Sequence, residues 1–204
     1  TTSFRMTCGL IEPDEGTVTL NGIDVTDWPL HRRAREGGMG YLAQESSVFR
    51  KLTVEQNLLG VMEMLGMSRR VRRSRCRELL EQFQITGLKN SRAYRLSGGE
   101  RRRLEIARCL ISDPEIILLD EPFAGIDPVT VQSIQSIIRG LSQQGIAILI
   151  TDHAAREILQ IVDHCYVIAE GQVMVHGSSE EVRNNKDVKR KYLGEERPGE
   201  GAAA

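Results

Sequence analysis

The sequence predicts an α/β fold in which helices cover both faces of a mostly parallel sheet, with a small all-α insertion. Two apolar runs, residues 116–119 and 146–150, lack polar alternation, which is typical of strands buried on both faces of such a sheet. The third observation is Ser-Gly-Gly at residues 97–99. Apolar residues follow it at helical spacing, which predicts a helix that begins there. Polar residues end both runs, and ligands bind at the carboxyl edge of parallel sheets. We therefore expect a ligand site at that edge.

The first part of the chain predicts short elements. Residues 1–10 predict a helix that ends at Gly9, since glycine readily adopts the left-handed conformation found at helix ends. Residues 17–20 predict a strand, and Asn21-Gly22 is a hairpin turn signal. Residues 40–44 predict a short buried strand that ends at the polar residue Gln44.

Two helices are predicted between residues 53 and 84. The first begins with a capping box, in which Thr53 is the N-cap and Gln56 follows three residues later. Its apolar face is expected to contain Val54, Leu58, Val61 and Leu65. The second helix is expected over about residues 69–84, and its apolar stripe consists of Cys76, Leu79, Leu80 and Phe83.

Six arginines crowd the start of that second helix: Arg69, Arg70, Arg72, Arg73, Arg75 and Arg77. Such a run can bind nucleic acid or anionic lipid. More often it is a solvated helix surface. We favour the solvated interpretation, because no aromatic residues interleave and acidic residues elsewhere balance the charge.

Residues 97–99 offer backbone N–H groups and a hydroxyl at the start of a helix, an arrangement that binds anions. The glycines let a phosphate approach the backbone closely. The helix is expected to bury Leu104, Ala107, Leu110 and Ile111 and to place Arg101, Arg102, Arg103 and Arg108 on its other faces. Ser-Gly-Gly alone is usually a turn, so this motif needs support from elsewhere.

Asp120 and Glu121 follow the first apolar run directly. A carboxylate at this position suits Mg²⁺, and a second one suits a general base that takes a proton from water. Alone, such a pair is usually a solvated strand end. The joint occurrence of this pair and the Ser-Gly-Gly motif, about 20 residues apart, favours the chemical interpretation.

The last third of the chain predicts three further features. Asp127 and Pro128 suit the N-cap and first position of a helix that buries Val131, Ile134, Ile138 and Leu141. Residues 165–168 and 172–175 flank Glu170-Gly171 as a hairpin. Residues 178–193 look helical and polar, and residues 198–204 are expected to be disordered.

Composition excludes several functional classes. The 204 residues suffice for one domain, or one with a subdomain. Aromatics at 4% and a net charge of −1 do not indicate nucleic-acid binding. The four cysteines form no C-x-x-C pair, which indicates reduced thiols in a cytosolic protein. No apolar run approaches the roughly 18 residues of a membrane span, and there is no signal peptide, so we expect any membrane association to come through partners.

Leu-Ser-Gly-Gly-Glu at residues 96–100 and Leu-Leu-Asp-Glu-Pro at residues 118–122 resemble the signature and Walker B motifs of ABC-type ATPases. Further short pieces cover most of the chain and are similar to the ATPase subunit of lipopolysaccharide-export transporters. They lie at residues 29–31, 40–42, 44–45, 49–50, 100–103, 120–125, 150–153 and 192–195.

This resemblance implies a P-loop NTPase fold with a three-layer core and an inserted helical subdomain. It implies an ATPase core at residues 1–45 and 96–177, a helical signature subdomain at 46–95, and a C-terminal helix and tail at 178–204. No G-x-x-x-x-G-K-[S/T] occurs, and residues 1–10 match the helix that follows such a loop. We therefore expect the chain to begin just after the lysine of the phosphate loop and to lack that loop and the strands before it.

The resemblance also implies site residues. Glu121 would be the catalytic base, with His153 and Gln44 sensing the γ-phosphate, and Mg²⁺ would be held by Thr1, Gln44 and Asp120. ATP-binding positions would be Thr1, Thr2, Ser97, Gly98, Gly99, Glu100 and Asp127. Phe49 and Arg50 would line a groove for a membrane partner. Simpler readings remain open: a surface glutamine at 44, a helix-start histidine at 153 and a core phenylalanine at 49.

The implied function is hydrolysis of ATP with Mg²⁺ by two copies that sandwich nucleotides, powering lipopolysaccharide export through transmembrane permease subunits. The protein would then be cytoplasmic and peripheral on the inner membrane, without direct nucleic-acid contact.

Three alternatives compete with this function. A branched-chain amino-acid importer ATPase shares the generic motifs, although residues 29–31 and 192–195 argue against it. An ABC ATPase of DNA repair or translation would need a long insert or a second cassette, and Thr1 to Ser97 span only 96 positions (97 − 1). The third is a catalytically inactive chain. Without a phosphate loop, we expect the isolated chain to bind ATP weakly and to aggregate.

Overall fold

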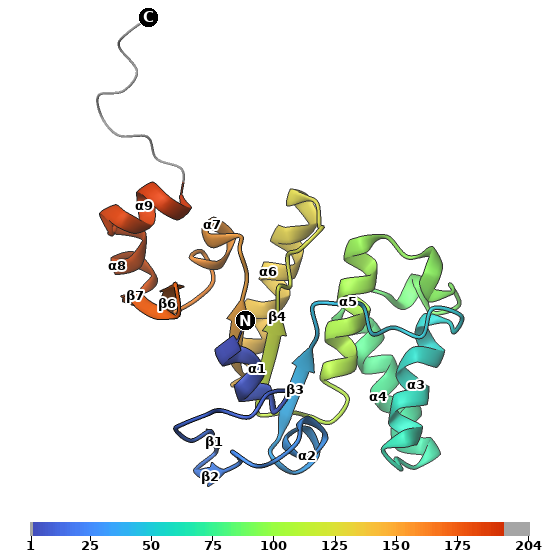
Figure 1. Ribbon diagram of the computed structural model, residues 1–204. Helices are drawn as coiled ribbons and strands as arrows, with labels where there is room; N and C mark the ends of the chain where they lie inside the picture. Colours follow the sequence, from blue (N-terminus) through green and yellow to red (C-terminus); the bar gives the residue numbers. More distant parts are fainter. Residues whose placement is uncertain (1, 194–204) are drawn as a thin grey trace, which may run out of the picture. The chain divides into compact units, whose positions relative to one another are not determined.

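A computed structural model describes residues 2–193 (Figure 1). The chain divides into two compact units, residues 1–151 and 152–204. This division differs from the predicted boundaries at residues 45/46, 95/96 and 177/178, which stay a prediction. Thr1 and the tail at 198–204, predicted as a metal ligand and as disordered, lie outside the described residues.

A three-stranded parallel sheet forms the centre of the first unit, in the order β3-β4-β5. Its strands are β3 (Met39–Leu42), β4 (Ile116–Asp120) and β5 (Ala147–Thr151). The register pairs Leu42 with Leu119 and Asp120 with Thr151. The carboxyl ends of all three strands therefore meet at one edge, as the sequence predicts.

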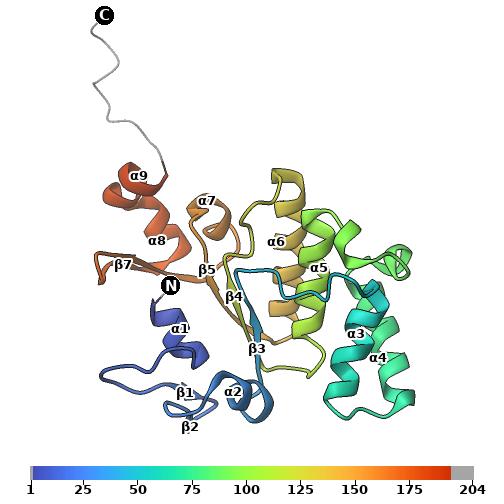
Figure 2. The ribbon, with the colours of Figure 1, turned by 45° about the vertical axis from the view of Figure 1, so that its right-hand side comes forward.

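Helices cover both faces of this sheet (Figure 2). On one face, buried Phe4 and Cys8 of a short helix pack with Leu118 and with Leu20 of a small antiparallel hairpin. On the other face lie the helix that starts after Ser97 and the one that starts after Asp127. The predicted α/β fold with three layers is confirmed. These elements are α1 (Thr2–Cys8), β1 (Thr19–Leu20), β2 (Ile23–Asp24), α2 (Leu30–Glu36), α5 (Gly98–Cys109) and α6 (Pro128–Gln143).

The prediction that residues 146–150 are buried on both faces is wrong. β4 is almost wholly buried, whereas every residue of β5 is at least partly exposed, and Leu149 is 39% exposed. Leu149 pairs with Leu118 and points to the same face of the sheet. The apolar cluster around Phe4 and Cys8 of α1 packs on Leu118 but does not include Leu149. The apolar side chains of β5 are therefore not covered by α1.

Arg33, on α2, is 1% exposed and fastens α1 to the segment before α2. Its guanidinium donates to the carbonyl oxygens of Met6 and Thr7, both at 2.7 Å, at the end of α1. It also donates to the carbonyl oxygens of Thr26 at 2.6 Å and Trp28 at 2.7 Å. Five N–H donors in a rigid fork make arginine suited to such a cluster of acceptors.

The helical subdomain contains the two predicted helices, α3 (Val54–Met64) and α4 (Arg69–Gln82). The capping box of Thr53 and Gln56 forms as predicted. Leu65, however, is 44% exposed rather than part of the buried face, because α3 ends at Met64 and the chain turns there. Two short 3₁₀ helices, Thr86–Leu88 and Ala93–Arg95, lead to α5.

The second unit contains the predicted hairpin and its C-terminal helices. Glu170 and Gly171 both have positive φ, 52° and 75°, as the predicted two-residue turn requires. The buried core of the second unit consists of Leu159, Val182, Val188 and Leu193. Its elements are α7 (Ala155–Ile158), β6 (His164–Ala169), β7 (Gln172–Ser178), α8 (Ser179–Asn184) and α9 (Lys186–Tyr192). Within residues 2–193, no helix is both long and apolar enough to cross a membrane.

Three thiols are shielded by the fold. Burial raises the pKa of Cys8 to about 12, of Cys76 to about 11 and of Cys109 to about 12. A rise from the ordinary 9.0 to about 11 lowers the thiolate fraction roughly 100-fold. We expect these three cysteines to resist iodoacetamide at pH 8 in the folded protein and to react in urea, as measured by mass spectrometry. Rapid alkylation of the folded protein at any of the three would contradict this.

The same raised pKa values make stability depend on pH. In the unfolded chain these thiols ionise near pH 9, whereas in the fold they ionise only near pH 11 to 12. Their contribution is therefore fully present below pH 9 and is lost as the pH rises through this interval.

Candidate functional site

Asp120 and Thr151 end neighbouring strands at the carboxyl edge of the sheet. Asp120 is 2% exposed, and its Oδ1 accepts a hydrogen bond from the hydroxyl of Thr151 at 2.7 Å. Its other oxygen, Oδ2, accepts no hydrogen bond from any residue that the structure describes. Thr151 was predicted only as the end of a strand, so its role in orienting Asp120 is new.

Glu121 follows Asp120 in a left-handed backbone conformation, with φ of 47°. A positive φ is uncommon for a residue with a side chain and is found at functional sites. The backbone N–H of Glu121 donates to the carbonyl oxygen of Thr151 at 2.7 Å. Its Oε2 accepts from Nε2 of Gln44 at 2.8 Å. Two of the predicted site residues, 77 positions apart in the chain, are thus in direct contact.

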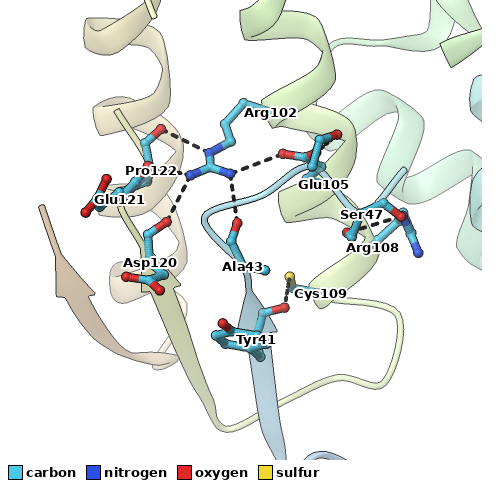
Figure 3. A network of polar contacts seen from close by, with 11 residues as sticks. Tyr41, Ala43, Ser47, Arg102, Glu105, Arg108, Cys109, Asp120, Glu121 and Pro122 are labelled. Atoms are coloured by element: carbon cyan, nitrogen blue, oxygen red, sulfur yellow. Dashed lines mark hydrogen bonds and ion pairs between the residues drawn. The ribbon is translucent and has the colours of Figure 1, made fainter. Parts of the chain in front are cut away.

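A buried arginine, Arg102, ties three segments of the site together (Figure 3). Arg102 is 6% exposed and donates to the carbonyl oxygens of Asp120, Glu121 and Pro122, just after β4. It also donates to the carbonyl oxygen of Ala43, directly before Gln44. Arg102 lies on a face of α5 other than that of the apolar residues, as the sequence predicts, but this face is buried as well. From there it fixes the backbone on both sides of the Gln44–Glu121 contact.

Glu105 neutralises this arginine. It is 4% exposed, lies one turn along α5 and forms an ion pair with Arg102 at 3.2 Å. Its other oxygen accepts from the hydroxyl of Ser46 at 2.6 Å, which ties the segment after Gln44 to α5. Opposite charges at i and i+3 were visible in the sequence, but they do not say which face of the helix is buried.

The start of α5 is exposed at Ser97 and Gly98 and buried at Gly99. Ser97 caps the helix: its hydroxyl accepts from the N–H of Glu100 at 3.3 Å, and the Glu100 carboxylate accepts from the N–H of Ser97 at 2.8 Å. This capping box already places a negative carboxylate where an anion would sit. The N–H groups of the first turn beyond it are the ones available to a phosphate.

Gly99 serves helix packing. A Cβ at Gly99 would lie 2.2 Å from Cγ2 of Thr130 on α6, whereas one at Gly98 would lie 3.8 Å from the nearest atom, the carbonyl oxygen of Gly125. We expect Gly99→Ala to lower the free energy of unfolding by about 1–3 kcal/mol through overpacking, as measured by urea denaturation. Gly98→Ala is the matched control and should change it by less than about 1 kcal/mol.

A second substitution identifies the atom responsible. Thr130→Ser removes Cγ2 and keeps the hydroxyl, so it should restore most of the stability lost by Gly99→Ala. No rescue would mean that the loss comes from the backbone of α5.

Asp127 is the N-cap of α6. Its carboxylate accepts from the N–H of Thr130 at 3.0 Å and from the Thr130 hydroxyl, and these hydrogen bonds lower its pKa. This local role accounts for an aspartate at this position. Any role at an ATP site is additional to it.

Phe49 and Arg50 follow the Gln44 segment. Phe49 is 39% exposed, so it is not an ordinary core phenylalanine, and the guanidinium of Arg108 lies 4.8 Å from its ring centre. Buried Asn57 holds its backbone by accepting from the Phe49 N–H and donating to the Phe49 carbonyl oxygen. Arg50 is exposed beside it. Together they form a rigidly held, accessible aromatic and basic surface.

Two further predicted site residues are Thr2 and His153. Thr2 is exposed at the start of α1. His153 lies two residues beyond β5, at the start of the second unit, next to Asp152, whose side chain accepts from the N–H of Ala154.

No group of three or more His, Cys, Asp or Glu side chains suited to a metal ion exists among the described residues. Mg²⁺ at nucleotide sites needs only one or two protein ligands, because phosphates and waters complete its octahedron. Oδ2 of Asp120 and the side-chain oxygen of Gln44 are of the oxygen type that Mg²⁺ prefers.

Comparison with known proteins identifies the family. Residues 1–124 match the family model described as ABC transporter. The chain is 51% identical over 195 residues to an ABC transporter ATP-binding protein of Rhizobium meliloti, covering 96% of this chain and 72% of that protein. It is 45% identical over 197 residues to the lipopolysaccharide export system ATP-binding protein LptB of Haemophilus influenzae, covering 96% and 81%.

Solved structures agree with this assignment. The fold is similar to an ATP-binding cassette of an ABC transporter, MJ1267, with a TM-score of 0.82 and 26% identity over 93% of this chain and 80% of that one. Motifs, fold and relatives lead to one conclusion: the chain belongs to the ABC transporter family, as an LptB-like ATP-binding subunit.

Proposed function

We propose that this subunit hydrolyses ATP to power the export of lipopolysaccharide from the inner membrane. The observation that carries hydrolysis is the contact between Gln44 and Glu121 beside the buried carboxylate of Asp120. Export of lipopolysaccharide is supported by the 45% identity to proteins that carry this name. Both parts of the proposal, hydrolysis and export, agree with membership of the ABC transporter family, whose ATP-binding subunits hydrolyse ATP.

Glu121 is the general base. Its carboxylate takes the proton from a water molecule as the water attacks the γ-phosphate, and ADP and phosphate are released. Gln44 donates to this carboxylate and so orients it, while Arg102 fixes the backbone of both residues. Asp120, Gln44 and Thr1 would hold Mg²⁺, which would supply positive charge to the phosphate oxygens.

The rest of the site comes from a second copy of the chain. The first turn of α5 binds the phosphates of a nucleotide held by the partner copy; it is exposed at Ser97 and Gly98 and half-buried at Glu100. The family resemblance extends the ATP contacts to Thr2, Gly99 and Asp127. It assigns to His153 a hydrogen bond to the γ-phosphate.

A permease docks on the surface formed by Phe49 and Arg50. Exposed aromatic and arginine residues are enriched at the centres of interfaces, and Phe49 is held rigidly by Asn57. Because this surface follows Gln44 directly in the chain, docking and the nucleotide site share one segment. By the family resemblance, the protein works at the cytoplasmic side of the inner membrane.

The test is depletion of the protein in its native cells. If it powers lipopolysaccharide export, newly made lipopolysaccharide accumulates in the inner membrane and fails to reach the surface, as measured by membrane fractionation. The complementing gene restores export, and the same gene carrying Glu121→Gln does not.

The alternative is the ATPase of a branched-chain amino-acid importer. Depletion would then leave lipopolysaccharide at the surface and reduce uptake of radiolabelled leucine. That outcome would reject the export proposal while leaving ATP hydrolysis in place.

A further inference from the structure

The turn between α3 and α4, with the start of α4, carries both exposed arginine side chains and exposed apolar side chains. Four arginines of α4, Arg69, Arg70, Arg73 and Arg77, are exposed. Three large apolar residues next to them, Met64, Leu65 and Val71, are 70%, 44% and 52% exposed. We call these seven residues the basic tip.

The four arginines lack the partners that the other two arginines of the run have. Arg72 pairs with Glu63 at 2.7 Å, and Arg75 pairs with Asp113 and Glu78. Arg69, Arg70, Arg73 and Arg77 form no ion pair with any residue in the described part of the chain. Residues 69, 73 and 77 are spaced four apart, so they share one face of α4.

The positive charge in the first turn of α4 lowers the stability of that helix. α4 has no acidic residue in its first turn, where Arg69 and Arg70 lie. Positive charge near a helix N-terminus opposes the macrodipole, so these two arginines weaken α4 rather than support it. The cost indicates that they serve an external partner.

The surface has a shape that can hold phosphate groups. Arg69, Arg70, Arg73, Ser74 and Arg77 line a groove of about 510 Å³ along α4. Guanidinium groups bind phosphate through paired N–H donors, and the hydroxyl of Ser74 adds a donor at the side of the groove.

The apolar half of the tip selects a bilayer over nucleic acid. Met64, Leu65 and Val71 have no use in a purely ionic contact, and residues 54–82 contain no Phe, Tyr or Trp on which bases would stack. Apolar side chains rimmed by arginine are typical of a surface that lies in the headgroup region of an anionic membrane.

We propose that the basic tip rests on acidic phospholipids of the membrane. The phosphates of the headgroups lie between the arginines, and Met64 and Leu65 reach the boundary of the acyl chains. This contact is the chain's own, and it is additional to the association through a permease.

The test is flotation of the purified protein with vesicles, which needs neither nucleotide nor permease and is therefore independent of the proposed function. We expect binding to phosphatidylcholine vesicles that contain phosphatidylglycerol, none to phosphatidylcholine alone, and loss of binding at high salt. The variant R69Q/R70Q/R73Q/R77Q should bind at least tenfold more weakly, since each arginine near an anionic surface contributes roughly fivefold.

A control separates the tip from charge in general. R35Q/K186Q/R190Q/K191Q removes the same number of exposed charges elsewhere and should bind like the unmodified protein. Met64→Ser/Leu65→Ser should weaken binding and keep the preference for phosphatidylglycerol. Circular dichroism confirms that each variant is folded.

Several results would overturn the proposal. One is equal loss of binding in the control variant. A second is binding to single-stranded RNA without binding to vesicles, which would assign the arginines to nucleic acid. A third is displacement from vesicles by inorganic phosphate beyond the effect of chloride at equal ionic strength, which would indicate a site for free phosphate.

Discussion

In the protein that includes the phosphate loop, Glu121→Gln is expected to slow ATP hydrolysis about 10²- to 10⁴-fold, because an amide cannot accept the proton of the attacking water. Glutamine has the same shape and keeps an oxygen that accepts from Nε2 of Gln44. It also carries the same backbone cost at a φ of 47°, since both residues have a Cβ. The fold should therefore be unchanged, and the ATP-bound dimer should still close.

The measurement is steady-state phosphate release by the protein with its membrane partners, together with gel filtration in the presence of ATP. Glu115→Gln is the matched control, since Glu115 precedes β4 at the opposite end of the strand and accepts from Asn21 there. That control should hydrolyse ATP at the unmodified rate. Unmodified turnover by Glu121→Gln would remove Glu121 from the role of base.

Arg102→Met is expected to lower the free energy of unfolding by about 3–5 kcal/mol, as measured by urea denaturation. The substitution leaves Glu105, which is 4% exposed, as a buried charge without its cation. It also leaves the carbonyl oxygens of Asp120, Glu121, Pro122 and Ala43 without this donor. Breaking one half of a buried ion pair is costly for this reason.

Two variants test the explanation. Arg102→Met combined with Glu105→Leu should be less destabilised than Arg102→Met alone, because the uncompensated charge is gone. Arg101→Met is the neighbouring control: Arg101 donates only to the carbonyl oxygen of Leu96, so the change should stay within about 0.5 kcal/mol. A loss below about 1 kcal/mol for Arg102→Met would mean that water replaces the guanidinium.

The fold was predictable where local rules act. The apolar run of β4, the capping boxes at Thr53 and Ser97, and the N-cap at Asp127 all depend on neighbours within four positions. The proximity of Gln44 and Glu121 was also predictable from the sequence, because parallel strands bring their carboxyl ends together.

Burial of charged residues was not predictable. Arginine is seldom fully buried, and the spacing of residues along α5 does not show that other segments cover the face on which Arg102 lies. The exposure of β5 also depends on a segment distant in the sequence, because α1 covers Leu118 of β4 and does not extend to Leu149 of β5. Periodicity reports what a strand is able to bury, whereas tertiary packing decides what covers it.

Arg33 has a consequence for how the protein withstands acid. The four oxygens that hold its guanidinium are peptide carbonyls, and none of them gains a proton between neutral pH and the range in which carboxylates do. The joint around Arg102, in contrast, includes a side-chain carboxylate, that of Glu105. In acid, the attachment of α1 through Arg33 should therefore persist, because none of its acceptors is an acidic side chain.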